Sequence, residues 1–538
     1  MKRRNLFLLL FLFTGYTIIA QQAPSDFSLG KEKSLSKISQ TNANNPANNS
    51  VSDIITIGDT IWLGTGKGVS LSTDRGETWT NFNSDDAFGS NSTSAIGYNN
   101  GVFWVALAYN TEANGENVQT GGGFAYTTNN GNTWTKIPQP VDDPSDSLIS
   151  YGINDGVNLP RVRALPVTVP QQNLSFDIAF TPGTIWITSF AGGLRRSNDN
   201  GASWQRVLLP SDRVNEISPE DTIKFNLQPV PGNFGPEGYL NHRTFSVIST
   251  DPSTLFVGTA GGINKSTDGG ISWRKLTATN QQNPISGNFV VALAYDTSSS
   301  TIWAATWRAE GQTEFYGVSS SSDGGENWQT FLEDERVHNF GFVNGVNAGV
   351  IAAADNGAFR SKDNGVSWIL PPLIKDDQTD ILLPTNVYYS AGSQGNDIWL
   401  GSADGLARLS ETGLMWSGNW KVFFASQPLA SKTETYAFPN PFSPKIDLLK
   451  IKYSTGSSGA PVTIRIFDFG MNYIRTVIQN AQRGGPAHVV DDLENTNGVI
   501  DYWDGKDDNG NIVPNGVYFY RVEVGSDEPV FGKILVIQ

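Results

Sequence analysis

Two aspartates are the residues whose positions most directly suggest chemistry. Asp53 and Asp177 align at equivalent points of two short apolar segments that are far apart in the chain. Paired carboxylates can act as general acid and base in glycoside hydrolysis when their separation and pKa values fit. They can also bind water or a cation. The alignment leaves open whether these two carboxylates face each other.

Composition and charge exclude several other chemistries. The chain of 538 residues contains no Cys, and its three His are at positions 242, 338 and 488. It therefore has no disulfide framework, no thiol nucleophile, no Cys-ligated metal and no helical His-x-x-x-His metal motif. The formal net charge of -15 argues against nucleic acid or an anionic membrane as a partner. We therefore expect no metal, no cofactor and no nucleic-acid ligand.

The first twenty residues predict a signal peptide. A basic start at Lys2, Arg3 and Arg4 precedes an apolar run over residues 6–13, and Ala20 offers a small residue at a cleavage point. This run is shorter than the ~20 residues that a membrane span requires, so no transmembrane anchor is expected after cleavage. We expect a bacterial protein that is secreted or held at the outer cell surface. Residues 21–49 then form a polar N-terminal segment.

The elements that position Asp53 and Asp177 are expected to be short strands. The chain has 56 Gly, 27 Pro, 15 Trp and 16 Tyr, and only 17% of its residues are charged. Such a composition is typical of an all-β protein with many tight turns.

An internal repeat, Ser-x-Asp-x-Gly-x-x-Trp, dominates residues 50–424. It occurs at residues 72–79, 127–134, 197–204, 266–273, 321–328 and 361–368, and a degenerate seventh copy covers 409–416. The acidic or amide residue should accept hydrogen bonds from a tight turn, Gly should supply a positive φ, and Trp should enter the core. The residues to which we assign these structural roles are Asp74, Trp79, Asn129, Trp134, Asp199, Trp204, Asp268, Trp273, Asp323, Trp328, Asp363, Trp368, Glu411 and Trp416.

This repeat resembles the Asp-box, or bacterial neuraminidase repeat, of β-propellers such as sialidases, sortilin-type receptors and photosystem assembly factors. Two further apolar strands precede each copy, so each unit should be a meander of four antiparallel strands. Seven such units predict a seven-bladed β-propeller over residues 50–424.

Strand order places the long connections on one rim of this propeller. The turn between the first two strands of a unit and the repeat turn share one rim, whereas the other connections share the opposite rim. The long segments 108–122, 138–172, 208–241, 305–316 and 371–384 all fall on that second rim, which we call the insertion rim. Long loops on a rigid scaffold are common binding sites.

The insertion rim is therefore the expected place for a polar ligand, either a glycan or a protein segment. Its candidate ligand-binding residues are Tyr109, Tyr151, Arg161, Arg163, His242, Arg243, Trp307, Arg308, Glu310, Arg336 and His338. If Trp307 is an exposed contact, Trp307→Ala should weaken binding and leave the melting temperature nearly unchanged.

The likeness to sialidases implies an enzymatic alternative. Those enzymes use three Arg for the substrate carboxylate, a Tyr nucleophile with a Glu, and an Asp acid. Arg243, Arg308 and Arg336 lie on the expected rim, and Tyr389 lies on an inner strand, so Asp53, Asp177, Arg243 and Tyr389 are the catalytic candidates. The Arg-Ile-Pro signature of that family is missing from the first inner strand, and no Tyr–Glu pair can be assigned.

Residues 436–538 form a second domain after a linker at 425–435. Their alternating strands predict an immunoglobulin-like β-sandwich. The Pro439-Asn440-Pro441 segment, the Trp503–Gly510 loop and the basic-apolar end resemble FlgD-type immunoglobulin-like domains and the C-terminal sorting domains of type IX secretion. The resemblance implies that secretion machinery binds this domain.

The sequence thus predicts an exported, monomeric propeller that binds a polar ligand at its insertion rim without catalysis. An extracellular glycoside hydrolase, either sialidase-like or another exo-glycosidase, is the first alternative. An assembly or stability factor for a partner protein is the second.

Overall fold

The structure, a computed structural model, is built almost entirely from β-strands. It describes residues 42–43, 45–83, 88, 91–113, 115–151, 161–227, 239–308, 315–345, 347–377, 381–383, 385–425, 429, 433–445, 448–456, 459–484 and 499–538. The expected signal peptide and Glu310 lie outside these residues. Among the described elements, only the single-turn helix η2 (Leu240–His242) is not a strand, and no described helix is long and apolar enough to cross a membrane.

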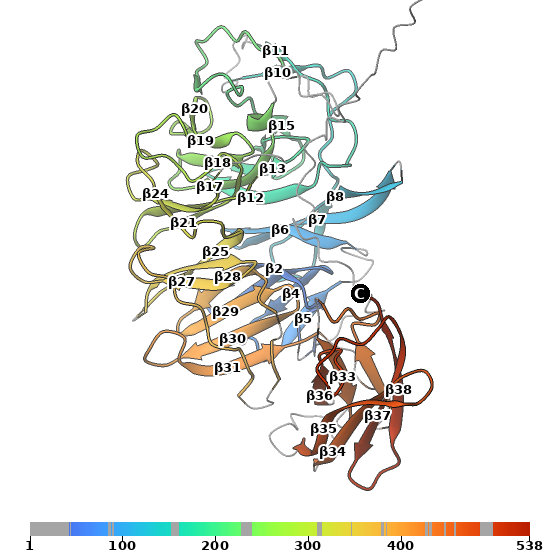
Figure 1. Cartoon of the computed structure of the whole chain (residues 1–538). Helices are drawn as coiled ribbons and strands as arrows, with labels where there is room; N and C mark the ends of the chain where they lie inside the picture. Colours follow the sequence, from blue (N-terminus) through green and yellow to red (C-terminus); the bar gives the residue numbers. More distant parts are fainter. Residues whose placement is uncertain are drawn as a thin grey trace, which may run out of the picture.

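In the described part of residues 51–423, seven antiparallel meander sheets follow one another, and one separate two-stranded hairpin lies between the second and the third (Figure 1). Sheets one to three consist of β2 (Val51–Ile57), β3 (Thr60–Thr65), β4 (Val69–Ser72) and β5 (Trp79–Phe82); β6 (Ser92–Asn99), β7 (Val102–Ala113), β8 (Glu116–Thr127) and β9 (Thr135–Ile137); and β12 (Ser175–Thr181), β13 (Thr184–Ser189), β14 (Arg195–Ser197) and β15 (Gln205–Arg206). Sheets four and five consist of β17 (Thr244–Ser249), β18 (Leu255–Thr259), β19 (Gly262–Ser266) and β20 (Trp273–Leu276); and β21 (Val290–Asp296), β22 (Thr301–Thr306), β23 (Gly317–Ser321) and β24 (Gln329–Phe331). Sheets six and seven consist of β25 (Val337–Val343), β26 (Gly349–Ala354) and β27 (Gly357–Ser361); and β28 (Tyr388–Gln394), β29 (Asp397–Ser402), β30 (Gly405–Glu411) and β31 (Gly418–Phe423).

The first strands of these sheets form a closed ring. Each contacts the first strand of the next sheet, in the order β2, β6, β12, β17, β21, β25 and β28, and β28 contacts β2 again. Sheets arranged radially around an axis, with their first strands innermost, are the architecture of a β-propeller. The expected propeller fold is therefore present.

The sheets differ from the predicted four strands in three places. Sheets one and four gain a short outer strand, β1 (Asn42–Ala43) paired with β5 and β16 (Glu216–Ile217) paired with β20. In the described residues of sheet six the fourth strand is reduced to one bridge, between Arg360 and Ile369. Pro371 and Pro372 follow this bridge directly, and proline cannot donate a ladder hydrogen bond.

Two of the expected loops contain strands. Most of segment 108–122 belongs to the extended β7–β8 hairpin, whose pairing continues from Ala108↔Gly121 to Ala113↔Glu116. Segment 138–172 contains a separate hairpin of β10 (Leu148–Ser150) and β11 (Arg161–Arg163). The strands β10 and β11 have three residues each, and only Ile149 and Val162, which face each other across the pair, are buried, so too few residues alternate for the sequence to predict a hairpin.

Six of the seven repeat turns are held by the same two kinds of side chain. In the first copy, Asp74 accepts a hydrogen bond from the backbone N–H of Thr78 at 2.9 Å, and Ser72 accepts one from the N–H of Gly76 at 2.7 Å. The same two contacts recur in the copies that contain Asn129, Asp199, Asp268, Asp323 and Asp363. The Ser hydroxyl is the contact that the sequence pattern alone did not assign.

The repeat glycine also packs each sheet against the preceding one. Gly76 has a φ of +83°, and a Cβ atom there would lie 2.3 Å from the indole ring of Trp399 in sheet seven. Gly131, Gly201, Gly270 and Gly365 meet side chains of the preceding sheet in the same way. Gly76 therefore helps to close the ring between the first and last sheets.

The seventh repeat has a different geometry. Glu411 accepts a hydrogen bond from the backbone N–H of Trp416, but it also forms an ion pair of 2.6 Å with the fully buried Arg360 of sheet six. Trp416 has a φ of +63° and lies two residues before β31, whereas Trp79 and Trp273 begin their strands and Trp134, Trp204 and Trp328 lie one residue before theirs. The longer Glu side chain thus joins two sheets, a role that the shorter Asp does not have in the other copies.

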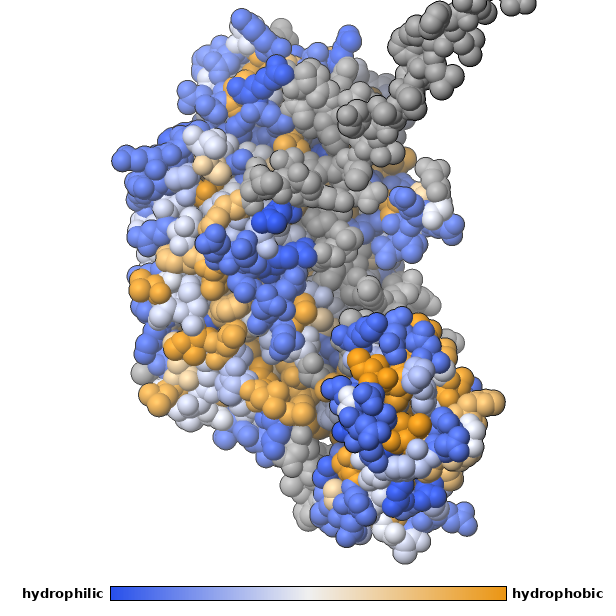
Figure 2. All heavy atoms as spheres, in the orientation of Figure 1, coloured by the Kyte–Doolittle hydropathy of each residue, from blue (hydrophilic) through white to orange (hydrophobic). Residues whose placement is uncertain are grey.

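The C-terminal residues form two sheets that share one apolar core. One sheet has the order β32 (Thr435–Phe438), β33 (Leu449–Tyr453) and β36 (Val499–Trp503); the other has β35 (Tyr473–Arg483), β34 (Ala460–Phe467), β37 (Gly516–Val524) and β38 (Val530–Val536). Their inward side chains, such as Ile451, Ile464 and Tyr520, are fully buried. Figure 2 shows apolar surface on this unit. Phe469 and Phe531 are among its exposed large apolar side chains, with exposed fractions of 75% and 55%.

Candidate functional site

A cavity of about 560 Å³ lies along the axis of the ring and is lined mainly by the inner strands. Asp53 and Asp177 both lie in its wall, together with Trp307, His338 and Tyr389. The sequence left open whether these two residues lie near each other, and in the structure both line one cavity.

A β-bulge occurs at the same point of every inner strand. The pairing with the second strand skips one residue in each sheet, namely Ser52, Ser94, Phe176, Phe245, Val291, His338 and Tyr389. All seven line the axial cavity. A bulge interrupts the ladder and leaves a backbone group to be satisfied in another way.

Each of the two aspartates directly follows a skipped residue and accepts a hydrogen bond from the next backbone N–H. Asp177 accepts hydrogen bonds from the backbone N–H of Ile178 at 2.8 Å, and from the N–H of Val247 and the hydroxyl of Ser246 at 2.9 and 2.7 Å. Val247 and Ser246 belong to the next sheet, so this carboxylate connects two neighbouring blades. Asp53 accepts from the N–H of Ile54 at 2.9 Å and is within 3.4 Å of the Asn339 amide.

Both carboxyl groups have raised pKa values. Burial, and then the charge of Asp177, raise the pKa of Asp53 from 3.8 to about 7. Burial also raises the pKa of Asp177, against the lowering effect of the hydrogen bonds from Ser246, Val247 and Ile178. A carboxyl group with a pKa near 7 can exchange a proton at neutral pH, which is one requirement for a general acid.

A polar and aromatic cluster lies at the insertion rim beside the cavity. The Arg336 guanidinium stacks 4.4 Å above the Trp307 ring and lies 3.6 Å from the Asp355 carboxylate. The Nε2 atom of His338 is 2.7 Å from the same carboxylate. The His338 ring packs edge-on between Trp307 and Tyr389, with ring centres 5.1 and 5.0 Å apart. We call Trp307, Arg336, His338, Asp355 and Tyr389 the rim cluster.

Asp355 is the member of the rim cluster that the sequence analysis missed. It lies in the turn between β26 and β27, where an Asp-Asn pair indicates only a turn. Burial alone would raise the pKa of Asp355, but the hydrogen bond from His338 and the charges of His338 and Arg336 hold it below its usual value. Asp355 is therefore an anion that orients two neighbouring cationic or polar groups.

Trp307 is buried, although the sequence analysis considered it as an exposed ligand contact. It is only 2% exposed, and its indole N–H donates to the backbone carbonyl of Val337 at 2.7 Å. Trp307 follows β22 directly, and its ring packs into the core of sheets five and six. The same ring contacts Arg336 and His338. The expectation that Trp307→Ala leaves the melting temperature unchanged is therefore wrong.

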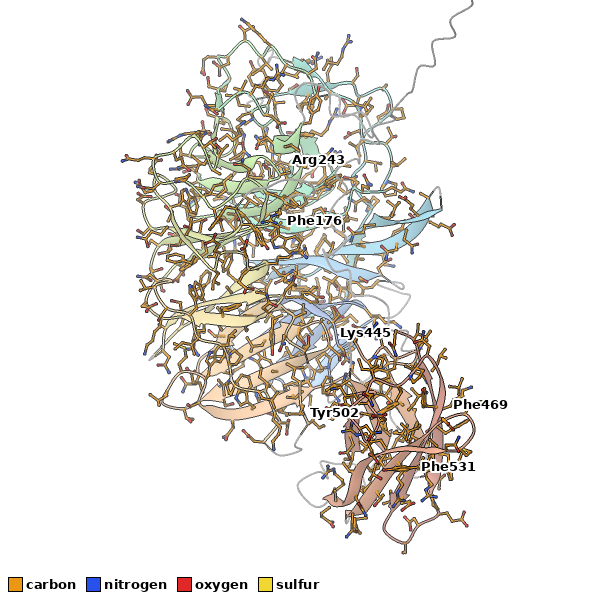
Figure 3. All side chains as sticks on the ribbon, viewed as in Figure 1. Phe176, Arg243, Lys445, Phe469, Tyr502 and Phe531 are labelled. Atoms are coloured by element: carbon orange, nitrogen blue, oxygen red, sulfur yellow. The ribbon has the colours of Figure 1, made fainter. Side chains whose placement is uncertain are left out.

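Two other candidates are also buried. Tyr151 is 3% exposed, and its hydroxyl donates to the backbone carbonyl of Asp221, so it joins two insertions. Arg243, which is labelled in Figure 3, is 7% exposed, and its guanidinium lies 4.4 Å from the centre of the Phe190 ring. Burial lowers the pKa of Arg243 to about 10, so the guanidinium remains charged at neutral pH.

His242 is half-buried beside this arginine. Burial, and then the charges of Arg206, Arg195 and Arg243, lower the pKa of His242 to about 4. Its imidazole is therefore neutral near pH 7.

The remaining candidates lie in three separate regions of the chain. Arg308 is exposed, stacks 5.1 Å from Tyr316 and lies 3.8 Å from Asp334, next to the rim cluster. Arg161 and Arg163 are exposed on β11, and Tyr109 is half-buried on β7. Arg243, Arg308 and Arg336, the expected arginine cluster, belong to the regions of sheets four, five and six. Within the described residues, no three His, Asp or Glu side chains gather to hold a metal ion.

Comparisons with known proteins give only distant likenesses. No family model and no curated protein match the chain. YCF48 from Cyanidioschyzon merolae is 14% identical over 62% of this chain and 84% of that chain, with a TM-score of 0.37. An ancestral GH74 enzyme is 13% identical over 93% of this chain and 63% of that chain, with a TM-score of 0.49.

A third solved structure is PorZ, a surface component of the type-IX secretion system of Porphyromonas gingivalis. It is 11% identical over 91% of this chain and 87% of that chain, with a TM-score of 0.25. Because all of these scores lie below 0.5, the assignment of the propeller rests on the strand pairing and ring closure of this chain itself.

Proposed function

We propose that this chain is an exported propeller that binds a polar ligand, a glycan or a protein segment, at its insertion rim. The single observation that supports this most strongly is the rim cluster. It presents a guanidinium, an imidazole and a carboxylate on an aromatic base beside the axial cavity. Such a combination suits hydroxyl, amide and carboxylate groups of a ligand.

The same proposal includes the finer architecture. We interpret the seven meander sheets as seven Asp-box blades, and the two C-terminal sheets as an immunoglobulin-like module that secretion machinery recognises. The signal segment at residues 1–20 and the sorting-domain resemblance of residues 436–538 support export to the cell surface. A binding role needs no cofactor.

A glycoside hydrolase is the second candidate, and the pKa of Asp53 favours it. A carboxyl group with a pKa near 7 beside a second carboxyl group meets the protonation requirement of an acid catalyst. The hydrogen bonds of Asp177 argue against a catalytic task for this carboxylate, and so they favour the binding role. Its oxygens already accept from three donors of the inner strands, which gives the carboxylate a structural task.

One experiment separates the two candidates. Residues 21–538 are incubated with immobilised sialosides, neutral polysaccharides and peptides, and both retention and released sugar are scored. Retention without release supports the binding role. Release of sugar that Asp53→Asn or Arg243→Ala abolishes, in variants that keep the wild-type melting temperature, would establish the hydrolase in its place.

A further inference from the structure

The strand β33 has an unusual burial pattern. Leu449, Ile451 and Tyr453 point into the core of the C-terminal unit, so the alternate residues Lys450 and Lys452 should point to solvent. They are nevertheless 0% and 1% exposed. Fully buried lysines are rare unless they are paired, so another part of the chain must cover this face.

The propeller supplies part of that cover at sheet seven. The Lys450 ammonium forms an ion pair with Asp404, which is 8% exposed and lies in the turn between β29 and β30. The ammonium also lies 5.1 Å from the ring of Phe424, which follows β31, and 5.8 Å from the ring of Phe438. The pair is therefore enclosed by aromatic rings from both units.

A second contact lies beside the first. Tyr502 is directly opposite Lys450 in the ladder between β33 and β36, and its hydroxyl donates to the backbone carbonyl of Leu382 at 3.0 Å. Burial, and then the charges of Asp404 and Asp501, raise the pKa of Tyr502 above its usual value, so it stays protonated as a donor. Figure 3 shows Tyr502 on the side of the C-terminal unit that faces the propeller, and Phe469 and Phe531 away from it.

Leu382 belongs to segment 371–384, one of the five long segments of the insertion rim. The turn that carries Asp404 connects the second and third strands of its sheet, and it therefore lies on the same rim. We propose that the C-terminal module is the partner of this insertion, and that the Lys450–Asp404 pair latches module and propeller into one body.

The Lys450–Asp404 pair should therefore hold the C-terminal module in one fixed orientation relative to the propeller. Without this pair, the module would change its orientation about the linker. A buried ion pair with one partner removed leaves an uncompensated charge, which strongly disfavours the docked state. Replacement of both partners by apolar residues of similar volume removes that penalty. A variant that lacks one partner should therefore undock the module, whereas a variant in which both partners are apolar should keep it docked.

The chain contains no cysteine, so two introduced cysteines can carry spin labels without background. The labels are placed at positions 59 and 527, which are both exposed, by Asp59→Cys and Asp527→Cys in residues 21–538. We expect a narrow distribution of inter-label distances in the otherwise wild-type chain. Asp404→Ala should broaden it and raise the rate of proteolytic cleavage between the two units about tenfold or more.

The double variant Asp404→Leu/Lys450→Met should keep the narrow distribution. Glu523→Ala, which removes the half-buried partner of Arg465 within the module, is the matched control and should leave distances and cleavage unchanged. If Asp404→Ala does not fold, Tyr502→Phe, which removes only the hydroxyl, should give partial broadening. A broad distribution in the wild-type chain, or a narrow one in Asp404→Ala, would overturn the proposal.

Discussion

At the scale of single residues, the inner aspartates combine a structural and a chemical property. The alignment of the internal repeats placed Asp53 and Asp177 correctly on equivalent strands, because the repeated strands can be recognised in the amino-acid sequence alone. It did not reveal the bulges, since a skipped residue depends on pairing with a neighbouring strand. The bulges are the reason that these carboxylates bind backbone N–H groups of their own strand and, for Asp177, of the next one.

The raised pKa of Asp53 gives a prediction about stability and pH. The folded chain holds this proton up to about pH 7, whereas the unfolded chain loses it near pH 4. The stabilisation of the folded chain by this bound proton is therefore complete below about pH 4, and it is lost as the pH rises to about 7. Asp53→Asn carries no titrating group, so its stability relative to wild type should increase by about 1 to 3 kcal/mol between pH 4.5 and pH 8.

Chemical unfolding at the two pH values measures this difference. Asp334→Asn removes one negative charge from an exposed position and controls for the change in net charge. A relative stability of Asp53→Asn that is the same at both pH values would mean that Asp53 is ionised throughout.

Trp307 gives a second prediction at this scale, a loss of stability where an exposed ring would have left the melting temperature nearly unchanged. Truncation of a buried Trp leaves a cavity and removes its hydrogen bond to Val337, so Trp307→Ala should cost about 3 to 5 kcal/mol of stability. Thermal unfolding measures the loss. Phe315→Ala, at a ring that is 40% exposed, should cost less than about 1 kcal/mol. Equal losses for both variants would contradict the buried position of Trp307.

At the scale of elements, the sequence predicted most of what is local. The repeat turns, the paired strands before them and the short turns follow from nearby residues, because Gly, Asp and apolar alternation act over a few positions. Non-local pairing was not predictable in the same way. The outer strands β1 and β16 and the reduced edge of sheet six depend on what the rest of the fold places beside them.

The repeat glycine gives a prediction for these elements. Gly76 and Gly101 have nearly the same φ, +83° and +84°, but only Gly76 has a neighbour within 4 Å, the Trp399 ring. Gly101→Ala should cost about 1 kcal/mol, from backbone strain alone. Gly76→Ala should cost about 1 to 3 kcal/mol more, because the added methyl group displaces the ring.

Thermal or urea unfolding of the two variants checks the comparison. Strain is common to both, so the difference between them isolates the contact across the first and last sheets. Equal losses would show that the turn of sheet one does not pack on sheet seven.

At the scale of the whole molecule, the ring of sheets separates two rims with different tasks. The repeat turns pack each sheet onto its neighbour, whereas the insertion rim carries the rim cluster, the anchored insertions and the contact with the C-terminal module. The sequence placed Trp307, Arg336 and His338 on one rim, and the structure brings them together. It could not predict that Tyr151 and Arg243 are buried, because burial on a rim depends on how the insertions fold over it.

The most direct test of ligand binding compares two arginines on opposite rims. Arg336 lies in the rim cluster, and Arg274 lies on β20 at the end of a repeat turn, where it pairs with Glu326. For the probe that is retained best by residues 21–538, titration calorimetry should show about tenfold weaker binding, or more, by Arg336→Ala. Arg274→Ala should bind as the wild type does. Unchanged binding by Arg336→Ala, or an equal loss in both variants, would contradict a ligand site at the insertion rim.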